Sequence, residues 1–581
     1  MAFSIAMPYM GSFCNITHNQ QDRDTRVRGR QVFFEALRLH GVDTIFGNPG
    51  TTESPLLDSL MDYPEMKYIV ALHEGVAVGA ANFHALATGK PVVANMHVAP
   101  GLGNAIGMIY GALKANSPVV VTAGAQDTRM QMRAPLLGHD LAAMAAPVVK
   151  WSTQVNHADE MGPVMQRAFR IATQHPAGPV FVALPINVME QETEVAATAG
   201  GDLATNAIAD AAALEKLAGL VKSSRKPVIV AGDDVAHYGA TESLVQLSER
   251  LGAGVFIELL TARVSFPMNH RHFFGRLGAD HKAIRNSLGD ADLVLLVGGP
   301  FFEEVWHSIP SPFAEGTRVI QIEQGPDRLA RNFPVSLGVS GDISHTLRVL
   351  TGSLEDDAAA GSRRKSLVKD KQAADANAAE RFAALAGRQP MAPIHALKSL
   401  SDALPENIVL VDESITAEND VVQAFQPVGP GDFYAGRGGG IGQGVAGALG
   451  AAVAHPDRPV VAISGDGSAM YSIQSLWTAA HHDLNILFVI LANREYRVLK
   501  HNVDAYRIRF DAPSNKPYPH MDLSGPVLDF VGMAAGMGVP GAIVSRPEDI
   551  KAAVDEAMAR PGPSVLELVV EGKETRGDAA G

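Results

Sequence analysis

The chain has 581 residues, of which 46% are apolar and 19% are charged, and its formal net charge is −14 at pH 7. Such a composition is typical of a globular protein with large cores, and the acidic balance argues against nucleic acid as the main partner, because phosphate binding needs a basic surface. The single cysteine, Cys14, excludes an intrachain disulfide and indicates a reducing, cytoplasmic location. No uninterrupted apolar stretch of about 18 residues occurs, so no membrane span is expected.

Residues 1–27 predict a polar, flexible extension, without the basic start and apolar core of a signal peptide. Beyond it, short β-branched apolar runs alternate with helical segments, as expected for strands that are buried on both faces of a parallel sheet. In chain order, the clearest runs are 67–71, 91–95, 118–122, 227–231, 291–297, 459–463 and 486–490. This alternation predicts doubly wound α/β domains.

Two connectors divide the chain. Residues 193–210 are rich in small and polar residues, and residues 353–389 are charged, alanine-rich and in part helical in pattern. They predict three parallel-sheet domains, over 28–195, 205–352 and 390–575.

The strongest local motif follows the run that ends at Ile463. It reads Ser464-Gly465-Asp466-Gly467-Ser468, and the next run ends just before Asn493. Because ligands in open α/β sheets collect at the carboxyl ends of strands, Asp466 and Asn493 are expected side by side. Their oxygens suit Mg²⁺, and the glycines let backbone amides approach a diphosphate. A Gly-Asp-Gly sequence alone is equally typical of a tight turn.

A second glycine pattern, GxGxxG, spans Gly442 to Gly447. No clean strand precedes it and no acidic residue follows at the distance of a dinucleotide site, so it is weak evidence for an NAD-dependent oxidoreductase. It predicts a glycine-rich loop that enters a helix.

Three further residues are candidates for proton transfer. Glu74 follows the run 67–71, His97 lies within 95–104 (NMHVAPGLGN), and His270 ends the segment 266–270 (FPMNH). Taken singly, Glu74 is equally well a charge that complements a helix dipole, and each histidine is more often structural.

Taken together, these segments resemble the thiamine diphosphate-dependent decarboxylases and acetohydroxyacid synthases, and among them the benzoylformate decarboxylases most closely. The resemblance covers 28–195 and 405–575 well and is looser in the middle domain, which some relatives use to bind FAD. It implies thiamine diphosphate with Mg²⁺ or Ca²⁺ as cofactors. It further implies that Glu74 hydrogen-bonds the aminopyrimidine ring and activates the cofactor, that His97 and His270 transfer protons, and that Thr51 orients the substrate carboxylate.

The same resemblance assigns the cofactor and metal ligands. Ala492 departs from the family, which usually has asparagine there, and Ile415 replaces a hydroxyl residue of a diphosphate-binding loop. The implied cofactor-binding residues are Gly439, Ile441, Thr416, Gly465, Gly467, Ser468 and Tyr496, and the implied metal ligands are Asp466, Asn493 and the backbone carbonyl of Glu495.

A third implied set forms the substrate pocket. Gly436 and Asn502 stand where benzoylformate decarboxylase places two phenylalanines around the substrate ring, so a wider pocket is expected unless neighbours such as Arg437 or His501 fill it. The implied pocket residues are Leu136, Leu137, Gly436, Val498, Leu499 and Asn502.

The function implied is non-oxidative decarboxylation of a small-molecule 2-oxo acid to an aldehyde and CO₂, with carboligation as a side activity. The resemblance also implies a homotetramer in which Glu74 and Asp466 of different subunits meet, so that the active sites lie at dimer interfaces, and neither nucleic acid nor membrane is an expected partner. Three alternatives stay open: a carboligase or lyase of the acetolactate synthase or 2-hydroxyacyl-CoA lyase type, an NAD-dependent oxidoreductase, and a catalytically inactive binding protein. The two-histidine pattern favours decarboxylation.

Overall fold

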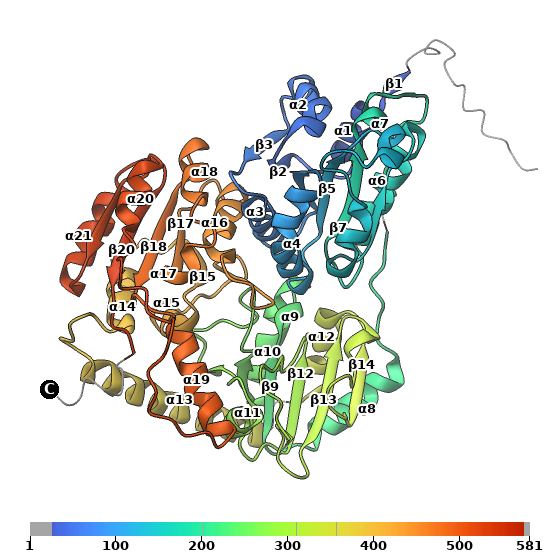
Figure 1. The fold of residues 1–581 in the computed structure, drawn as a ribbon. Helices are drawn as coiled ribbons and strands as arrows, with labels where there is room; N and C mark the ends of the chain where they lie inside the picture. Colours follow the sequence, from blue (N-terminus) through green and yellow to red (C-terminus); the bar gives the residue numbers. More distant parts are fainter. Residues whose placement is uncertain (1–25, 202, 310, 356, 574–581) are drawn as a thin grey trace, which may run out of the picture.

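The computed structural model describes residues 26–573 except 202, 310 and 356 (Figure 1). It contains three six-stranded sheets in which every neighbouring pair of strands is parallel, which confirms the predicted fold class. Of the extension predicted for 1–27, residues 1–25 lie outside the described part of the chain. Val27, by contrast, pairs with Thr193 in a small antiparallel ribbon of β1 (Val27–Arg28) and β8 (Glu192–Thr193).

The N-terminal sheet has the strand order β3-β2-β4-β5-β7-β6. Its four central strands, β2, β4, β5 and β7, are short and almost fully buried, as expected for a parallel sheet, whereas the edge strands β3 and β6 are partly exposed. The strands are β2 (Thr44–Asn48), β3 (Lys67–Val70), β4 (Val92–His97), β5 (Val119–Ala125), β6 (Ser152–Gln154) and β7 (Val180–Pro185). The helices are α1 (Gly29–Leu39), η1 (Thr51–Glu53), α2 (Ser54–Ser59), η2 (Leu60–Asp62), α3 (Glu74–Thr88), α4 (Val98–Lys114), η3 (Thr128–Arg133), α5 (Leu141–Ala145), η4 (Ala146–Val148), α6 (Ala158–Thr173) and α7 (Ile186–Glu190).

The middle sheet has the order β11-β10-β9-β12-β13-β14. Its strands are β9 (Pro227–Ala231), β10 (Gly254–Ile257), β11 (Phe273–Arg276), β12 (Leu293–Val297), β13 (Arg318–Glu323) and β14 (Leu337–Ser340). Its helices are α8 (Ala211–Lys222), α9 (Asp233–His237), α10 (Thr241–Leu251), α11 (His281–Leu288), η5 (Pro326–Arg328) and α12 (Ile343–Ser353). The connector that follows forms one long helix, α13 (Ala358–Ala384), most of whose side chains are exposed.

The C-terminal sheet has the order β16-β15-β17-β18-β20-β19. Its strands are β15 (Val409–Glu413), β16 (Phe433–Ala435), β17 (Val460–Gly465), β18 (Ile486–Ala492), β19 (Gly541–Val544) and β20 (Ser564–Val569). The helices are α14 (Pro393–Ala403), η6 (Ile415–Ala417), α15 (Glu418–Phe425), α16 (Gln443–Ala454), α17 (Asp466–Ala469), α18 (Ser475–His481), α19 (Arg497–Arg509), α20 (Phe530–Gly536) and α21 (Pro547–Met558).

Each sheet has a switch point, where successive connections leave in opposite directions along the sheet. It lies between β2 and β4, between β9 and β12, and between β15 and β17. The crevice at the carboxyl ends of such strands is the usual ligand site of doubly wound domains. The three switch points are therefore the places to look for function.

The N-terminal and C-terminal domains share one apolar core, in which α3 packs along α16. The helices approach closely because glycines face the contact: a Cβ at Gly447 would lie 2.5 Å from the Phe83 ring. Within the described residues, no helix combines the length and the apolar character needed to cross a membrane.

Candidate active site

The N-terminal switch point brings a histidine onto a buried carboxylate. His97 ends β4, and its Nδ1 lies 2.8 Å from Glu53 Oε2 and 3.1 Å from Thr52 Oγ1. Glu53 is 2% exposed and accepts backbone N–H groups of Gly50 at 2.9 Å and Gly124 at 2.6 Å. The carboxylate favours a proton on Nδ1, which leaves Nε2 free to exchange a proton with a substrate.

Sequence reasoning missed Glu53 and named only Thr51 in this part of the chain. The contact spans 44 residues and exists because β2 pairs with β4. A carboxyl residue just past the first strand of a switch point was the available signal. Thr51 itself is exposed, and its backbone carbonyl accepts from Ser54 Oγ at 2.8 Å.

Glu74 is the first residue of α3, as its position after a strand predicted. Its side chain is buried, and Oε2 accepts from Asn104 Nδ2 of α4 at 3.0 Å. A Cβ at Gly101 would lie 2.9 Å from Oε1, so a glycine in α4 makes room for the carboxyl group.

His270 lies in the middle domain, in the segment that precedes β11. Its Nε2 faces Glu249 of α10 at 3.5 Å and its ring packs edge-on against Phe266. Burial lowers its pKa below the ordinary value. The structure does not bring His270 onto His97, and its catalytic role stays a prediction.

The carboxyl ends of β17 and β18, next to the C-terminal switch point, bring the predicted metal ligands Asp466 and Asn493 together. Asp466 opens α17, is 3% exposed, and accepts N–H groups of Gly467 at 2.7 Å and Arg494 at 2.6 Å. Asn493 follows the adjacent strand, and its Oδ1 accepts from the Glu495 N–H at 3.0 Å. No cationic side chain of the described chain forms an ion pair with Asp466, and burial raises its pKa to about 6.

The surroundings of Asp466 fit a diphosphate and a divalent cation. The buried Ser414 hydroxyl has no hydrogen-bond partner within the described residues, and a Cβ at Gly439 would meet no atom within 4 Å. Ile415, beside Thr416 in η6, has a φ of 56°, which strains a β-branched residue and is typical of functional sites. The described residues contain no group of three or more His, Cys, Asp or Glu that could hold a metal; a carboxylate, an amide and a carbonyl completed by phosphate oxygens fit Mg²⁺ better.

Other predicted cofactor residues lie close to Asp466 or in the loop before α16. Gly465 and Ser468 flank Asp466, and the ring of Tyr496 lies against Gly467, where a Cβ would come within 2.7 Å. Gly439 and Ile441 belong to the loop 436–442, which connects β16 to α16.

The N-terminal and C-terminal candidate residues are not joined within one chain. No hydrogen bond or ion pair of the described residues links Glu74 or His97 to Asp466 or Asn493. The helices α2 and α19, which follow the carboxyl ends of β2 and β18, lie at opposite ends of Figure 1.

The predicted substrate residues are spread over two surfaces. Leu136 is 84% exposed, and Leu137 lines a cavity of about 520 Å³ beside Val98, the neighbour of His97. Val498, Leu499 and Asn502 lie on α19.

The side chain of Gln443 lies against Gly436. A Cβ at Gly436 would lie 3.0 Å from the Gln443 side chain. Gln443, rather than Arg437 or His501, is the side chain nearest to this position.

The GxGxxG segment does not form a phosphate site. Glu413, at the end of β15, accepts the N–H groups of Gln443 at 2.9 Å and Gly444 at 3.1 Å. Gly444 lies against Glu413, and Gly447 lies against Phe83. The amides at the start of α16 are therefore engaged by the protein itself, as is not the case in a dinucleotide fold.

Comparisons with known proteins agree with this geometry. Family models described as the N-terminal TPP binding domain, the central domain and the C-terminal TPP binding domain of thiamine pyrophosphate enzymes match residues 27–144, 214–350 and 417–568. A benzoylformate decarboxylase of Pseudomonas aeruginosa is 32% identical over 92% of this chain and 97% of its own. An acetolactate synthase large subunit of Parasynechococcus marenigrum is 28% identical over 94% of this chain and 88% of its own.

A solved structure gives the same result. The thiamine diphosphate-dependent 4-hydroxybenzoylformate decarboxylase of Rhodococcus jostii superposes with a TM-score of 0.82 and 27% identity, over 94% of this chain and 100% of that one. The chain belongs to the thiamine pyrophosphate enzyme family.

Proposed function

We propose that the protein is a thiamine diphosphate- and Mg²⁺-dependent decarboxylase that converts an aryl 2-oxo acid of the benzoylformate type to an aldehyde and CO₂. The observation that carries the proposal is the Glu53–His97 pair, with Nδ1 on a buried carboxylate at 2.8 Å. A fixed proton donor at this place favours protonation of the product carbon over attack on a second carbonyl. The benzoylformate decarboxylase among the relatives supports the same reading.

Each residue has a stated task in this proposal. When bound, the cofactor accepts the electron pair that CO₂ leaves behind. Glu74 donates to or accepts from the aminopyrimidine ring, Thr51 binds the substrate carboxylate, and His97 delivers a proton through Nε2. Asp466, Asn493 and the Glu495 carbonyl hold the cation that neutralises the diphosphate.

A second candidate is a carboligase of the acetolactate synthase type, which the relative at 28% identity supports. The test is a screen of aryl and aliphatic 2-oxo acids with added thiamine diphosphate and Mg²⁺, following CO₂, aldehyde and acyloin. Aldehyde as the main product supports the decarboxylase; acyloin or 2-hydroxy-3-oxo acid products support the carboligase. The variant Asp466→Ala is the control, and full activity in this variant after dialysis against EDTA would exclude the metal assignment.

We further propose that ring-substituted aryl 2-oxo acids are better substrates than benzoylformate, since Asn502 offers a polar wall where a phenylalanine is expected. Gln443 limits the extra room at Gly436. We expect Asn502→Phe to raise kcat/KM for benzoylformate relative to a hydroxylated analogue, within the about 10- to 200-fold range of pocket discrimination. An unchanged ratio of the two kcat/KM values would remove Asn502 from the pocket.

We also propose that each active site forms between two copies of the chain, within a homotetramer, because Glu74 and Asp466 are not joined within one copy. Mixing the inactive variants Glu74→Gln and Asp466→Ala tests this directly. If sites are shared, each mixed dimer has one intact site and activity returns; if each site lies within one chain, the mixture stays inactive.

A further inference from the structure

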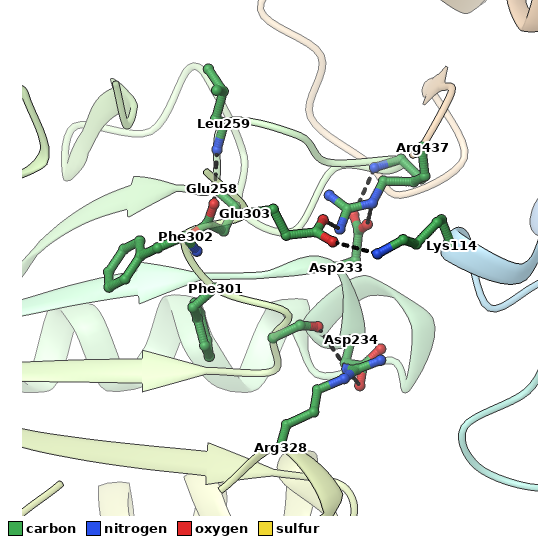
Figure 2. Close-up of polar contacts among 12 residues, drawn as sticks. Lys114, Asp233, Asp234, Glu258, Leu259, Phe301, Phe302, Glu303, Arg328 and Arg437 are labelled. Carbon is green, nitrogen blue, oxygen red and sulfur yellow. Dashed lines mark hydrogen bonds and ion pairs between the residues drawn. The ribbon is translucent and has the colours of Figure 1, made fainter. Parts of the chain in front are cut away.

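The middle-domain switch point holds a cluster of carboxyl groups. Asp233 and Asp234 follow β9, Glu258 follows β10, and Glu303 follows β12. Glu258 is engaged by the N–H groups of Phe302 at 2.9 Å and Leu259 at 3.2 Å. Figure 2 shows that Asp233 and Glu303 instead face Arg437, which comes from the C-terminal domain.

Arg437 is buried in this cluster, with 2% of its surface exposed. Its Nη2 donates to Glu303 Oε2 at 2.5 Å, and its Nε lies 3.3 Å from Asp233 Oδ2. Lys114, the last residue of α4, donates to the other oxygen of Glu303 at 3.0 Å. Burial alone would raise the pKa of Glu303, but the two cations hold that pKa below its ordinary value. The cluster thus joins all three domains.

The backbone of Arg437 lies in the loop 436–442, which also carries Gly439 and Ile441. Gln443 Nε2 donates to the carbonyls of Arg437 at 2.9 Å and Gly440 at 2.7 Å and so holds the loop from within. Gly438 has a φ of 78° and packs closely against α4: a Cβ at Gly438 would lie 2.9 Å from Lys114 Cγ. The guanidinium of Arg437 therefore fixes the side of the loop 436–442 that faces the middle domain, while Gln443 and α4 hold the rest of the loop.

We propose that Arg437 is a positioning residue for the cofactor: its ion pairs with Asp233 and Glu303 fix the loop 436–442 against the middle domain, in the conformation that receives the aminopyrimidine part of thiamine diphosphate. In this arrangement the middle-domain switch point binds the side chain of Arg437 from the same protein instead of a separate ligand. Its carboxylates, which bind a guanidinium, would repel the phosphates of a nucleotide. The inference rests on the proposed function in one respect, the placing of the cofactor at Gly439 and Ile441.

The test compares Arg437, which is buried, with Arg328, a half-buried arginine at the same edge of the middle sheet. Arg437→Met removes the anchor, whereas Arg328→Met breaks a similar pair, Arg328 to Asp234 at 2.8 Å, that has no contact with the loop. We expect Arg437→Met to weaken thiamine diphosphate binding by about 10- to 100-fold, the usual effect of losing a group that orients a ligand contact, with kcat at saturating cofactor changed far less. Arg328→Met should lower the melting temperature yet leave cofactor affinity as in the wild type, and Arg437→Lys should restore part of the affinity.

A second measurement needs no cofactor. Hydrogen–deuterium exchange of the amides of 438–442 in the cofactor-free protein should speed up in Arg437→Met and not in Arg328→Met. Unchanged exchange in Arg437→Met, or equal losses of cofactor affinity in both variants, would overturn the inference. Failure of the wild type to bind thiamine diphosphate would instead reject the proposed function, and the exchange result would still decide the anchor. If Arg437→Met does not fold, Glu303→Gln tests the same contact with an uncharged partner of equal shape.

Discussion

The imidazole of His97 owes its orientation to Glu53, which is itself fixed by two backbone N–H groups. In Glu53→Gln an amide replaces the carboxylate, so a proton on Nδ1 loses its charged acceptor and the ring is no longer held in one tautomer. We expect kcat/KM for a 2-oxo acid to fall by about 10- to 100-fold, part of what a positioned acid or base supplies.

Thr52→Val is the matched control for this change. It removes the hydroxyl 3.1 Å from the same nitrogen but keeps the carboxylate. Equal losses of kcat/KM in the two variants would show that Glu53 has no special role, and the melting temperature of each separates loss of activity from loss of fold.

In the proposed mechanism, Glu74 acts on the cofactor rather than on the substrate. The amide of Glu74→Gln keeps the hydrogen bond from Asn104 but cannot exchange a proton. We expect deuterium exchange at C2 of bound thiamine diphosphate to slow by about 10²-fold or more while cofactor binding persists. An exchange rate equal to that of the wild type would remove Glu74 from the mechanism.

Single residues were predictable where a motif is local. Asp466 and Asn493 lie side by side as expected, because two short apolar strands end next to them. Glu53 and Arg437 were not predictable, since their partners lie 44 and 134 residues away. The contact between Gln443 and Gly436 was not predictable either, because the side chain of Gln443 cannot be placed from sequence.

At the scale of elements, the strands and the second connector were predictable from the local composition of the sequence. The runs 459–463 and 486–490 form β17 and β18 because each is wholly apolar. The alanine-rich connector forms the long helix α13. The anchoring of α19 was not foreseen: Lys500 pairs with the buried Glu495, whose other oxygen accepts the N–H of Lys573 at 2.5 Å.

The link between β18 and α19 therefore depends on one buried ion pair. In Lys500→Met the carboxylate of Glu495 loses its partner, which costs about 3–5 kcal/mol for a buried pair. Because the carbonyl of Glu495 is a proposed metal ligand, the Mg²⁺ concentration for half-activation should also rise. Titration with Mg²⁺ and chemical denaturation measure the two effects.

A surface pair of the same type supplies the control for Lys500→Met. Lys371 pairs with Asp375 across one turn of the exposed helix α13, and such pairs contribute about 0.3–0.5 kcal/mol. Lys371→Met should leave both readouts near the wild-type values. Similar losses in the two variants would mean that burial does not decide the strength of the Lys500 pair.

For the molecule as a whole, the contacts between domains are the features that could not be predicted from the sequence. Three doubly wound domains follow from alternating apolar runs, but the shared core of α3 and α16 and the ion pairs of Arg437 arise only when the domains pack. Long-range contacts of this kind have no local pattern. The packing of the domains also buries several carboxyl groups, and burial disfavours their ionised form.

The pH dependence of stability tests those surroundings. Burial raises the pKa of Glu258 from 4.5 to about 7, so between these pH values the folded protein keeps a proton that the unfolded chain has released. Stability from this group is therefore lost as pH rises from about 4.5 to about 7, by at most about 3 kcal/mol. Denaturant unfolding at pH 5 and pH 8 should show a smaller difference in the free energy of unfolding for Glu258→Gln than for the wild type. Asp290→Asn, which changes an exposed carboxylate paired with Lys226, should keep the wild-type difference. If Glu258→Gln also keeps the wild-type difference, Glu258 is ionised in the folded protein, and the N–H groups of Phe302 and Leu259 offset the cost of burying its charge.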